Sequence, residues 1–359
     1  MKRGPIKNVP PSRCVSLREV VAHEHGTWTA DEAKVGDART DYALPVNASD
    51  EVLAYLRPLA TVEIAPGGTA RIPAGRVIGA GAVLSADGAL LARDVSGDLG
   101  NAAAHHWLIG YAGLRAPKSV DGSVAVAAVN LGEGYAHWLL EELPRLLTVP
   151  LGETEHLVVH ADAACARQAL TMRGGQERVI AATRRLHLRC APLVVPRLVA
   201  GPGAPTPRAL ELIEAFTTQL GRGLPGLGER LYFTREKAGR RRVVNESGLW
   251  ALLEGRGFTK VVLEELSWGE QIAACRRARV VVAPHGAGLA NLAFCAPGTR
   301  VVELVNRSYF NPGYWRLAAL KGLNYRVVMP DGESPLGENR SANRDDITAD
   351  LGRVSAALR

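Results

Sequence analysis

One stretch near the C-terminus combines a histidine with a glycine turn between two apolar runs. Residues 280–304 read VVVAPHGAGLANLAFCAPGTRVVEL. The valines that open this stretch predict a buried strand, and the residues after His285 predict a short apolar helix. Small residues let a ligand approach the backbone, and the N–H groups in the first turn of a helix attract anions. We therefore predict a diphosphate site formed by His285, Gly286, Ala287, Gly288 and Leu289.

The same turn has a second interpretation, in which its glycines serve only the close packing of strand and helix. A lone Gly-x-Gly is a weak signal, and the stretch lacks both the GxGxxG of dinucleotide folds and the lysine of a P-loop. Glu303 ends the strand that follows. An acidic residue in this place can bond ribose hydroxyls, so Glu303 is a candidate for ribose binding; the alternative is a solvated strand end.

A second polar group lies in the stretch GYAHWLLEELPRLL, residues 134–147. On a helix, His137, Glu141 and Arg145 are four residues apart and form one polar stripe beside an apolar face. Pro144 has no N–H to donate to the preceding turn, so the helix is expected to kink or end next to Glu141. A carboxylate beside a helix break and a histidine suits a general base. The alternative is an ordinary Glu141–Arg145 ion pair on a surface helix.

The elements that would position these residues alternate between strand and helix from about Ser119 onward. In the last third of the chain, predicted strands at 231–234, 260–263, 279–283, 300–304 and 325–329 alternate with predicted helices at 246–256, 268–278 and 313–320. Asn245 is available to cap the first of these helices, and Ser267 with Glu270 has the spacing of a capping box for the second. Such alternation implies a parallel, doubly wound sheet.

The Pro/Gly-rich link at 201–207 is the clearest domain boundary. We predict an α/β fold with two Rossmann-like domains facing a cleft, preceded by a β-rich segment. In that segment, Arg76–Leu84 and Ala89–Val95 predict a β-hairpin around Asp87-Gly88. The predicted partition is an N-terminal extension with the β-rich segment at 1–116, an N-terminal Rossmann-like domain at 117–204, a C-terminal one at 205–335, and a C-terminal tail at 336–359.

The composition disfavours several classes of protein. The 359 residues are 47% hydrophobic and 22% charged, and no apolar run approaches the roughly 20 residues of a membrane span. The five cysteines lack a CxxC pair, which argues against a disulfide framework or a zinc site and suits a reducing cytoplasm. The net charge is +7, but aromatic residues make up only 5% of the chain and do not interleave with the basic runs, which disfavours nucleic acid. A basic balance leaves a peripheral membrane association open.

Four stretches carry a family resemblance: GYAHWLLEELPRL, the run from Thr234-Arg235 through Asn245-Glu246, LSWGEQIAACRRARVVVAPHGAGLANLAF, and APGTRVVEL. In order and spacing they resemble glycosyltransferase family 61, a family linked to capsular polysaccharide synthesis. The resemblance covers about residues 124–330 and leaves 1–116 outside. It implies a GT-B fold, an inverting reaction, and a nucleotide-sugar donor, usually a UDP-sugar, bound mainly on the C-terminal domain.

The residues that match family positions lie in both predicted domains. His137 and Glu141 match the family's histidine and acidic residue, the latter usually an aspartate, and we take Glu141 as the general base with His137 as its catalytic partner. The chain departs from the family at Gly134, where an asparagine is usual, and Glu141 reaches one methylene further than an aspartate. For donor binding, the matching positions are Arg235, Asn245, Glu246 and the HGAG signature at 285–288.

These observations predict an inverting glycosyltransferase that moves a hexosyl or pentosyl group from a nucleotide sugar to a glycan or lipid-linked glycan, in the synthesis of surface or exported polysaccharide. The chain has no Asp-x-Asp pair, the usual device for holding a divalent ion against a diphosphate, so we predict that Arg235, His285 and the glycine turn stabilise the leaving group without a metal or other cofactor. The expected location is the cytoplasm or the inner face of the membrane, and a homodimer stays open.

Two alternatives to this function remain. One is another GT-B-like transferase, such as a polysaccharide pyruvyl transferase. The other is a catalytically silent module that binds a sugar or nucleotide. A dehydrogenase is disfavoured because no GxGxxG follows any predicted strand.

Overall fold

The computed structural model describes residues 10–30, 39–63, 67–97, 106–111, 113–332, 335–337 and 339–359. The chain divides into two compact units. Unit 1 comprises Met1–Ala38 and Ile64–Pro202, and unit 2 comprises Arg39–Glu63 and Gly203–Arg359. Within the described ranges, no helix is long and apolar enough to cross a membrane.

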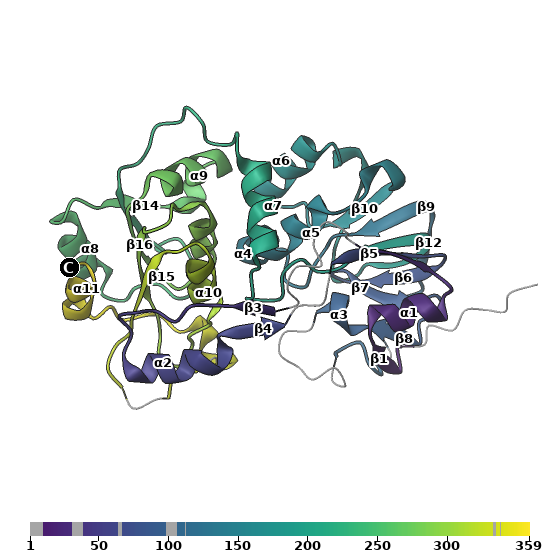
Figure 1. The fold of residues 1–359 in the computed structure, drawn as a ribbon, viewed down its shortest axis with the longest axis horizontal. Coiled ribbons are helices and arrows are strands. Elements are labelled where there is room, and N and C mark those ends of the chain that lie inside the picture. Colours follow the sequence, from purple (N-terminus) through teal and green to yellow (C-terminus); the bar gives the residue numbers. More distant parts are fainter. Residues whose placement is uncertain are drawn as a thin grey trace, which may run out of the picture. The chain divides into compact units, whose positions relative to one another are not determined.

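Unit 2 is built on a five-stranded parallel sheet with the strand order β14-β13-β15-β16-β17 (Figure 1). This order is that of a doubly wound fold, so the prediction for the last third of the chain is confirmed. The winding reverses between β13 and β15, and ligands of such sheets bind beyond the carboxyl ends of the strands at that point. The strands are β13 (Arg230–Phe233), β14 (Thr259–Val261), β15 (Val280–Pro284), β16 (Arg300–Leu304) and β17 (Asn324–Val328).

Helices cover both faces of this sheet (Figure 1). Side chains alternate along a strand, so Val302 and Leu304 enter one core together with residues of α8 and α11. Glu303, between them, points to the opposite face, where its charge acts on Tyr314 of α10. The helices of unit 2 after the link are α7 (Pro207–Thr217), α8 (Glu246–Glu254), α9 (Trp268–Arg277), α10 (Gly313–Leu320) and α11 (Leu351–Ala357).

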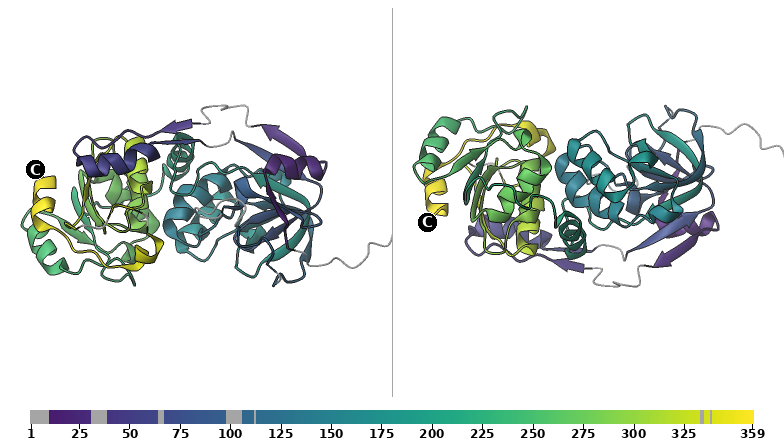
Figure 2. Two further views of the ribbon diagram at one scale, coloured as in Figure 1. Left: turned by 90° about the horizontal axis from the view of Figure 1, so that it is seen from below. Right: turned by 90° about the horizontal axis from the view of Figure 1, so that it is seen from above.

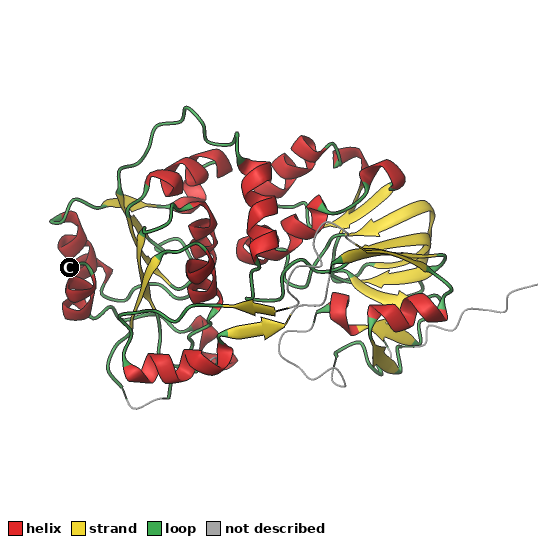
Figure 3. Cartoon of the chain, in the orientation of Figure 1, coloured by secondary structure: helices red, strands yellow, loops and turns green. Residues whose placement is uncertain are grey.

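Unit 1 contains a ten-stranded mixed sheet, whose strands are yellow in Figure 3. Its larger parallel part consists of β9 (Lys118–Val126), β10 (His156–Val159), β11 (Val179–Ala181) and β12 (His187–Pro196). Strand β12 also pairs antiparallel with β5 (Gly68–Ile72) and β6 (Gly75–Ile78). The β-rich segment and the predicted N-terminal Rossmann-like domain therefore share one sheet, because β12 is long enough to pair with two successive strands of the segment.

The β-rich segment is a meander rather than one hairpin. We predicted a single strand at Arg76–Leu84, but the chain turns at Gly79 and Gly81, whose φ angles of 59° and 100° favour glycine. A Cβ on Gly81 would lie 2.4 Å from the carbonyl oxygen of Ala128. The predicted Asp87-Gly88 turn does connect two strands. The remaining elements of unit 1 are β1 (Arg13–Val15), α1 (Leu17–His23), β2 (Thr27–Ala30), β7 (Ala82–Ser85), β8 (Leu90–Ala92), α3 (Arg93–Ser96) and α6 (Ala164–Arg173).

Residues 39–63 belong to unit 2 although unit 1 flanks them on both sides in the sequence. They form β3 (Arg39–Asp41), α2 (Asp50–Leu56) and β4 (Thr61–Glu63), which lie against unit 2 in both views of Figure 2. The tail predicted at 336–359 also joins unit 2, since α11 enters its core. Local sequence patterns predict α2 but carry no information about the unit on which it packs.

The capping box of α9 is present and can be tested. Ser267 accepts a hydrogen bond from the Glu270 N–H at 3.3 Å, and the Glu270 carboxylate accepts one from the Ser267 N–H at 2.8 Å. We expect Ser267→Ala to lower the free energy of unfolding by about 1 kcal/mol, and Ser267→Gly by only a few tenths. Urea denaturation followed by circular dichroism measures both, and equal losses would contradict the capping role.

Candidate functional site

A buried carboxylate–histidine pair lies at the carboxyl end of the unit 2 sheet. His285 directly follows β15, and its Nδ1 hydrogen-bonds with the carboxylate of Glu303 on the neighbouring strand β16. The other carboxylate oxygen of Glu303 accepts a hydrogen bond from the Tyr325 hydroxyl at 2.6 Å. Glu303 is fully buried, and both its oxygens have protein partners. This geometry argues against the predicted ribose contact and makes Glu303 the group that orients His285.

Two tyrosines contact the ring of His285. The ring of Tyr309, from the loop after β16, meets it edge-on with centroids 5.5 Å apart. The ring of Tyr314, from the first turn of α10, lies at 5.1 Å. Burial raises the pKa of Tyr314, and the charge of Glu303 raises it further, so its phenol stays protonated near neutral pH. His285 is thus held on three sides, and Nε2 is the nitrogen that can meet a ligand.

Arg235 lies against the glycine that follows His285. It belongs to the loop after β13, and a Cβ on Gly286 would lie 2.0 Å from its Nη1. Close approach explains glycine at this position, because the backbone of Gly286 is extended, with φ of 171°. A Cβ on Gly288 would likewise lie 2.5 Å from Cδ1 of Leu263. The structure therefore brings the predicted residues Arg235, His285 and Gly286 together.

Arg235 and Arg241 form a cationic pair in the loop after β13. Burial lowers the pKa of Arg235, and the charge of Arg241 lowers it further. Burial also lowers the pKa of Arg241, whose guanidinium lies over the Tyr309 ring, 5.5 Å from its centroid. Within the described part of the chain, the Nε atoms of both arginines are buried without a hydrogen-bond partner. An anion would relieve both the repulsion and the unmet hydrogen bonds. Sequence reasoning missed Arg241.

The helix predicted after the glycine turn is a 3-10 helix, η8 (Ala287–Phe294). Its first internal hydrogen bond runs from the Leu289 N–H to the Gly286 carbonyl at 2.9 Å. The N–H groups of Ala287 and Gly288 precede this bond, so the helix offers them no acceptor. Leu289 is buried and already uses its N–H, which makes it a packing residue rather than the predicted ligand contact.

Asn245 and Glu246 follow the loop that carries Arg235 and Arg241, and both side chains have partners within the fold. The Asn245 side chain donates to the Ala349 carbonyl at 2.8 Å and accepts from the Ala349 N–H at 2.9 Å, so it does not cap α8 as predicted. The Glu246 carboxylate accepts hydrogen bonds from Tyr232, at 2.9 Å, and from Thr234, which precedes Arg235. Both predicted donor-binding residues therefore have structural partners, and their geometry favours an indirect role.

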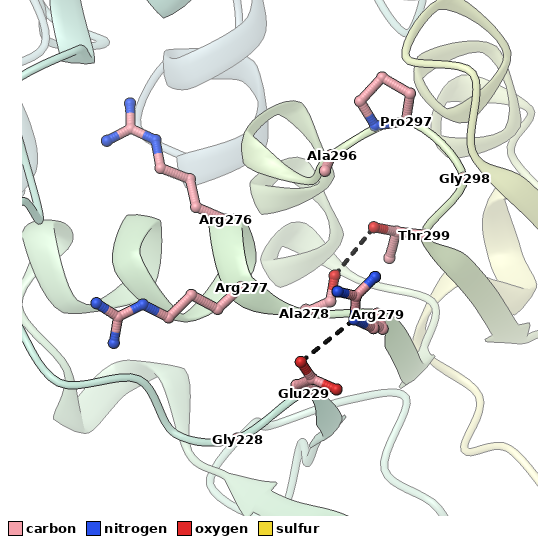
Figure 4. A pocket seen from close by; sticks show the side chains of 10 residues that line it. All are labelled: Gly228, Glu229, Arg276, Arg277, Ala278, Arg279, Ala296, Pro297, Gly298 and Thr299. Atoms are coloured by element: carbon pink, nitrogen blue, oxygen red, sulfur yellow. Dashed lines mark hydrogen bonds and ion pairs between the residues drawn. The ribbon is translucent and has the colours of Figure 1, made fainter.

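An arginine-lined pocket of about 620 Å³ lies elsewhere on unit 2 (Figure 4). Its residues, including Arg277 and Arg279, directly precede β15, and Thr299 precedes β16. The pocket therefore sits at the amino ends of the parallel strands, the opposite edge of the sheet from His285. Arg279 pairs with Glu229 at 3.2 Å, so part of its charge is already compensated. Chemistry and topology both favour the carboxyl edge as the ligand site.

In unit 1, the helix predicted at 135–147 is interrupted beside Glu141. The Leu143 N–H bonds the carbonyl of Trp138, five residues back, in a π-helical turn, and Pro144 follows without an N–H. Such turns occur often at functional sites. The helix does not end next to Glu141, and the irregularity there takes the form of this π-helical turn. The pieces are α4 (Tyr135–His137), the π-helical turn Trp138–Glu142 and α5 (Leu143–Leu147).

Glu141 pairs with His137 across this turn. Nδ1 of His137 lies 2.8 Å from Oε1 of Glu141, and the side chains are 28% and 7% exposed. Burial lowers the pKa of His137, but the hydrogen bond and charge of Glu141, with the charge of Glu133, raise it by more, so the net shift is upward. A histidine whose Nδ1 is held by a carboxylate presents Nε2 as a general base. The geometry thus favours His137, rather than Glu141, as the group that meets the substrate.

Arg145 does not pair with Glu141. Its side chain is fully buried and donates to the carbonyls of Pro196, at 2.9 Å, and Ala128, at 2.8 Å. Burial lowers the pKa of Arg145 to about 10, so it remains charged at neutral pH. The interpretation of Glu141 and Arg145 as an ion pair on a surface helix is therefore wrong, since this helix is buried.

A second carboxylate–histidine pair in unit 1 was not predicted. The buried Glu142 carboxylate accepts hydrogen bonds from the N–H of Val129, at 3.1 Å, and of His160, at 2.7 Å, and lies 2.6 Å from Nδ1 of His160. A Cβ on Gly132 would lie 2.2 Å from this carboxylate. Glu142 thereby ties the loop after β9 to the end of β10. The only signal in the sequence was a histidine directly after the apolar run Leu157–Val159.

Metal ligands were also considered. Among the residues described, no group of three or more His, Cys, Asp or Glu side chains could hold a metal ion. The predicted metal independence of the site stays a prediction.

The doubly wound sheet, whose switch point carries an oriented histidine, a glycine turn and two arginines, defines an α/β protein. Residues 135–302 match the family model of glycosyltransferase 61. Over these residues, a little under half of its length, the chain is similar to the glycosyltransferase 61 family. The match includes His137, Glu141, Arg235 and His285.

Two plant enzymes are similar to short parts of the chain. A beta-1,2-xylosyltransferase of Arabidopsis thaliana is 27% identical over 100 residues, which are 24% of this chain and 19% of that protein. The beta-1,2-xylosyltransferase RCN11 of Oryza sativa subsp. japonica is 36% identical over 59 residues, which are 16% of this chain and 11% of that protein. The chain thus spans less than a fifth of the length of each relative.

The Glu142–His160 pair predicts a pH-dependent stability. Burial lowers the pKa of His160, but Glu142, Glu133 and Asp162 raise it by more. A raised folded-state pKa adds stability below the unfolded value of about 6.5, and this stability is lost as the pH rises through the folded value. We expect Glu142→Gln to cost about 1–3 kcal/mol at pH 6 and less at pH 9, measured by urea denaturation. A loss that is equal at both pH values, or matched by the exposed control Glu153→Gln, would contradict the pairing.

Proposed function

We propose that the chain is an inverting glycosyltransferase that transfers a sugar from a nucleotide diphosphate donor, a UDP-sugar, to a hydroxyl of a glycan. The observation that carries the proposal is the convergence of Arg235 and Arg241 beside Gly286 and His285, at the switch point of a doubly wound sheet. Buried like charges with unmet hydrogen bonds suit a ligand that carries several negative charges, as a nucleoside diphosphate does.

The proposed reaction is a single in-line displacement. The acceptor oxygen forms a bond to the anomeric carbon while the bond from that carbon to the diphosphate oxygen breaks, and the electron pair leaves with the diphosphate. We assign the acceptor proton to Nε2 of His137, with Glu141 orienting the ring. The departing charge is assigned to Arg235, Arg241 and the N–H groups of Ala287 and Gly288. This division of roles follows the GT-B arrangement that the family resemblance implies.

The sugar is proposed to be a pentose, because both plant relatives are named xylosyltransferases. A glycan acceptor of the surface or exported polysaccharide type remains our proposal from the family resemblance. So does a location in the cytoplasm or at the inner face of the membrane.

Calorimetry with UDP, GDP and phosphoenolpyruvate tests the ligand class, and release of UDP from UDP-xylose or UDP-glucose tests the activity. We expect UDP to bind most tightly and UDP-sugar to turn over. Tighter binding of phosphoenolpyruvate would favour a pyruvyl transferase. Binding of UDP without turnover of any sugar nucleotide, on a broad acceptor panel, would favour a silent binding module.

The two arginines predict a large effect on binding. Replacing Arg235 or Arg241 by methionine removes a charged hydrogen-bond donor, and we expect each to weaken UDP binding by about 10-fold to 100-fold. Arg279→Met, in the pocket at the opposite edge of the sheet, is the matched control and should leave the dissociation constant unchanged. A stronger effect of Arg279→Met would move the site to that pocket.

The pH dependence of turnover distinguishes the two candidate bases. The base must be neutral to accept a proton, so turnover should fall as the pH drops through the raised pKa of His137. Glu141→Gln removes the charge that does most to raise this pKa and leaves that of Glu133, so the acid limb should move to lower pH while the maximal rate falls. His137→Ala should lower turnover by about 100-fold to 10,000-fold. If His137→Ala stays active while Glu141→Gln does not, Glu141 itself is the base.

A further inference from the structure

Residues 39–63 make close contacts with the part of unit 2 that carries Tyr309 and Tyr314. The family match begins only at residue 135, so nothing in it assigns a role to this segment. Below, the segment 39–63 is called the clasp. It includes α2 and the β3–β4 ribbon, and it lies against unit 2 in both views of Figure 2.

The first contact of the clasp holds the loop after β16. The Tyr55 hydroxyl of α2 donates to the carbonyl of Phe310 at 2.8 Å, and the two rings lie 5.5 Å apart. Glu51, one turn earlier on α2, forms an ion pair with Arg307. These contacts lie on both sides of Tyr309 in the sequence, so the clasp fixes the loop at the residue that meets His285.

The second contact holds the start of α10. Nε1 of Trp315 donates to the Ala43 carbonyl at 2.9 Å. Arg316 donates to the Leu59 carbonyl from Nη2, at 2.8 Å, and its guanidinium lies over the Tyr42 ring, 5.4 Å from the centroid. Both residues directly follow Tyr314, the other tyrosine against His285.

The loop held in this way has little regular structure of its own. Within residues 305–312 an isolated bridge joins Asn306 and Tyr309, and no helix or strand spans the loop. A loop that is not held by its neighbours must be ordered by the ligand, and that ordering lowers affinity. The contacts of the clasp order this loop before a ligand binds.

We infer that the clasp is a positioning element of the donor site, with Tyr55 as its central residue. Through Phe310 and Arg307 it holds Tyr309 against His285 and under Arg241, so that the cationic site is formed before the ligand arrives. This inference rests on the proposed function, since it names residues that support the same site. The N-terminal region thereby contributes to donor binding from outside the family segment.

Tyr55→Phe tests the inference in the full-length chain, because it keeps the ring and removes one hydrogen bond. We expect UDP to bind about threefold to tenfold more weakly, with a melting temperature close to that of the parent. Hydrogen exchange should be faster in residues 305–310 of the free variant and should return to the parental rate at saturating UDP. Glu51→Gln, which loosens the same loop from another side, should act in the same direction.

The control is Tyr111→Phe, an exposed tyrosine of unit 1. It should change neither the UDP affinity nor the exchange of 305–310. If Tyr55→Phe and Glu51→Gln both bind UDP like the parent, the clasp is structural only and the inference is overturned. If the parent itself does not bind UDP, the proposed function has failed and the two outcomes are told apart.

Discussion

A carboxylate removed from water must be compensated by a partner, and this requirement organises both units. Glu303 is fully buried behind the glycine turn and needs His285 and Tyr325 to complete its hydrogen bonds. His285 cannot turn away without leaving a buried charge unpaired. The need to pair Glu303 therefore fixes three features together: the position of the turn, the register of β15 against β16, and the orientation of the histidine.

The same pairing occurs twice in unit 1, and exposure separates the roles. The Glu142–His160 pair is almost wholly buried and joins two loops. In the other pair the carboxylate of Glu141 is buried, but the ring of His137 is partly exposed. The π-helical turn lets adjacent glutamates serve these two pairs. The partly exposed ring of His137 can exchange a proton with a substrate, whereas the Glu142–His160 pair holds the two loops together.

Sequence patterns predicted well where structure is local. The parallel sheet of unit 2 and the Ser267 capping box follow from periodicity and spacing. Sequence patterns did not predict contacts between residues that lie far apart in the chain. Nothing near Arg145 indicates that the distant carbonyl of Pro196 binds it, and nothing in residues 39–63 indicates unit 2 as their place. Asn245 has the right type and position for a cap, but a competing partner 104 residues away takes its side chain.

The two units differ in the charge that surrounds their carboxylate–histidine pairs. Near His137, the half-exposed Glu133 adds to two carboxylates already paired with histidines, and this negative surplus favours a protonated imidazole. Near His285, the carboxylate of Glu303 is already hydrogen-bonded within the fold. Arg235 and Arg241 therefore repel each other with no carboxylate between them to offset their charge. A surplus of negative charge strengthens a base, and a surplus of positive charge receives an anion. Each of these surpluses follows from which carboxylates the fold has buried.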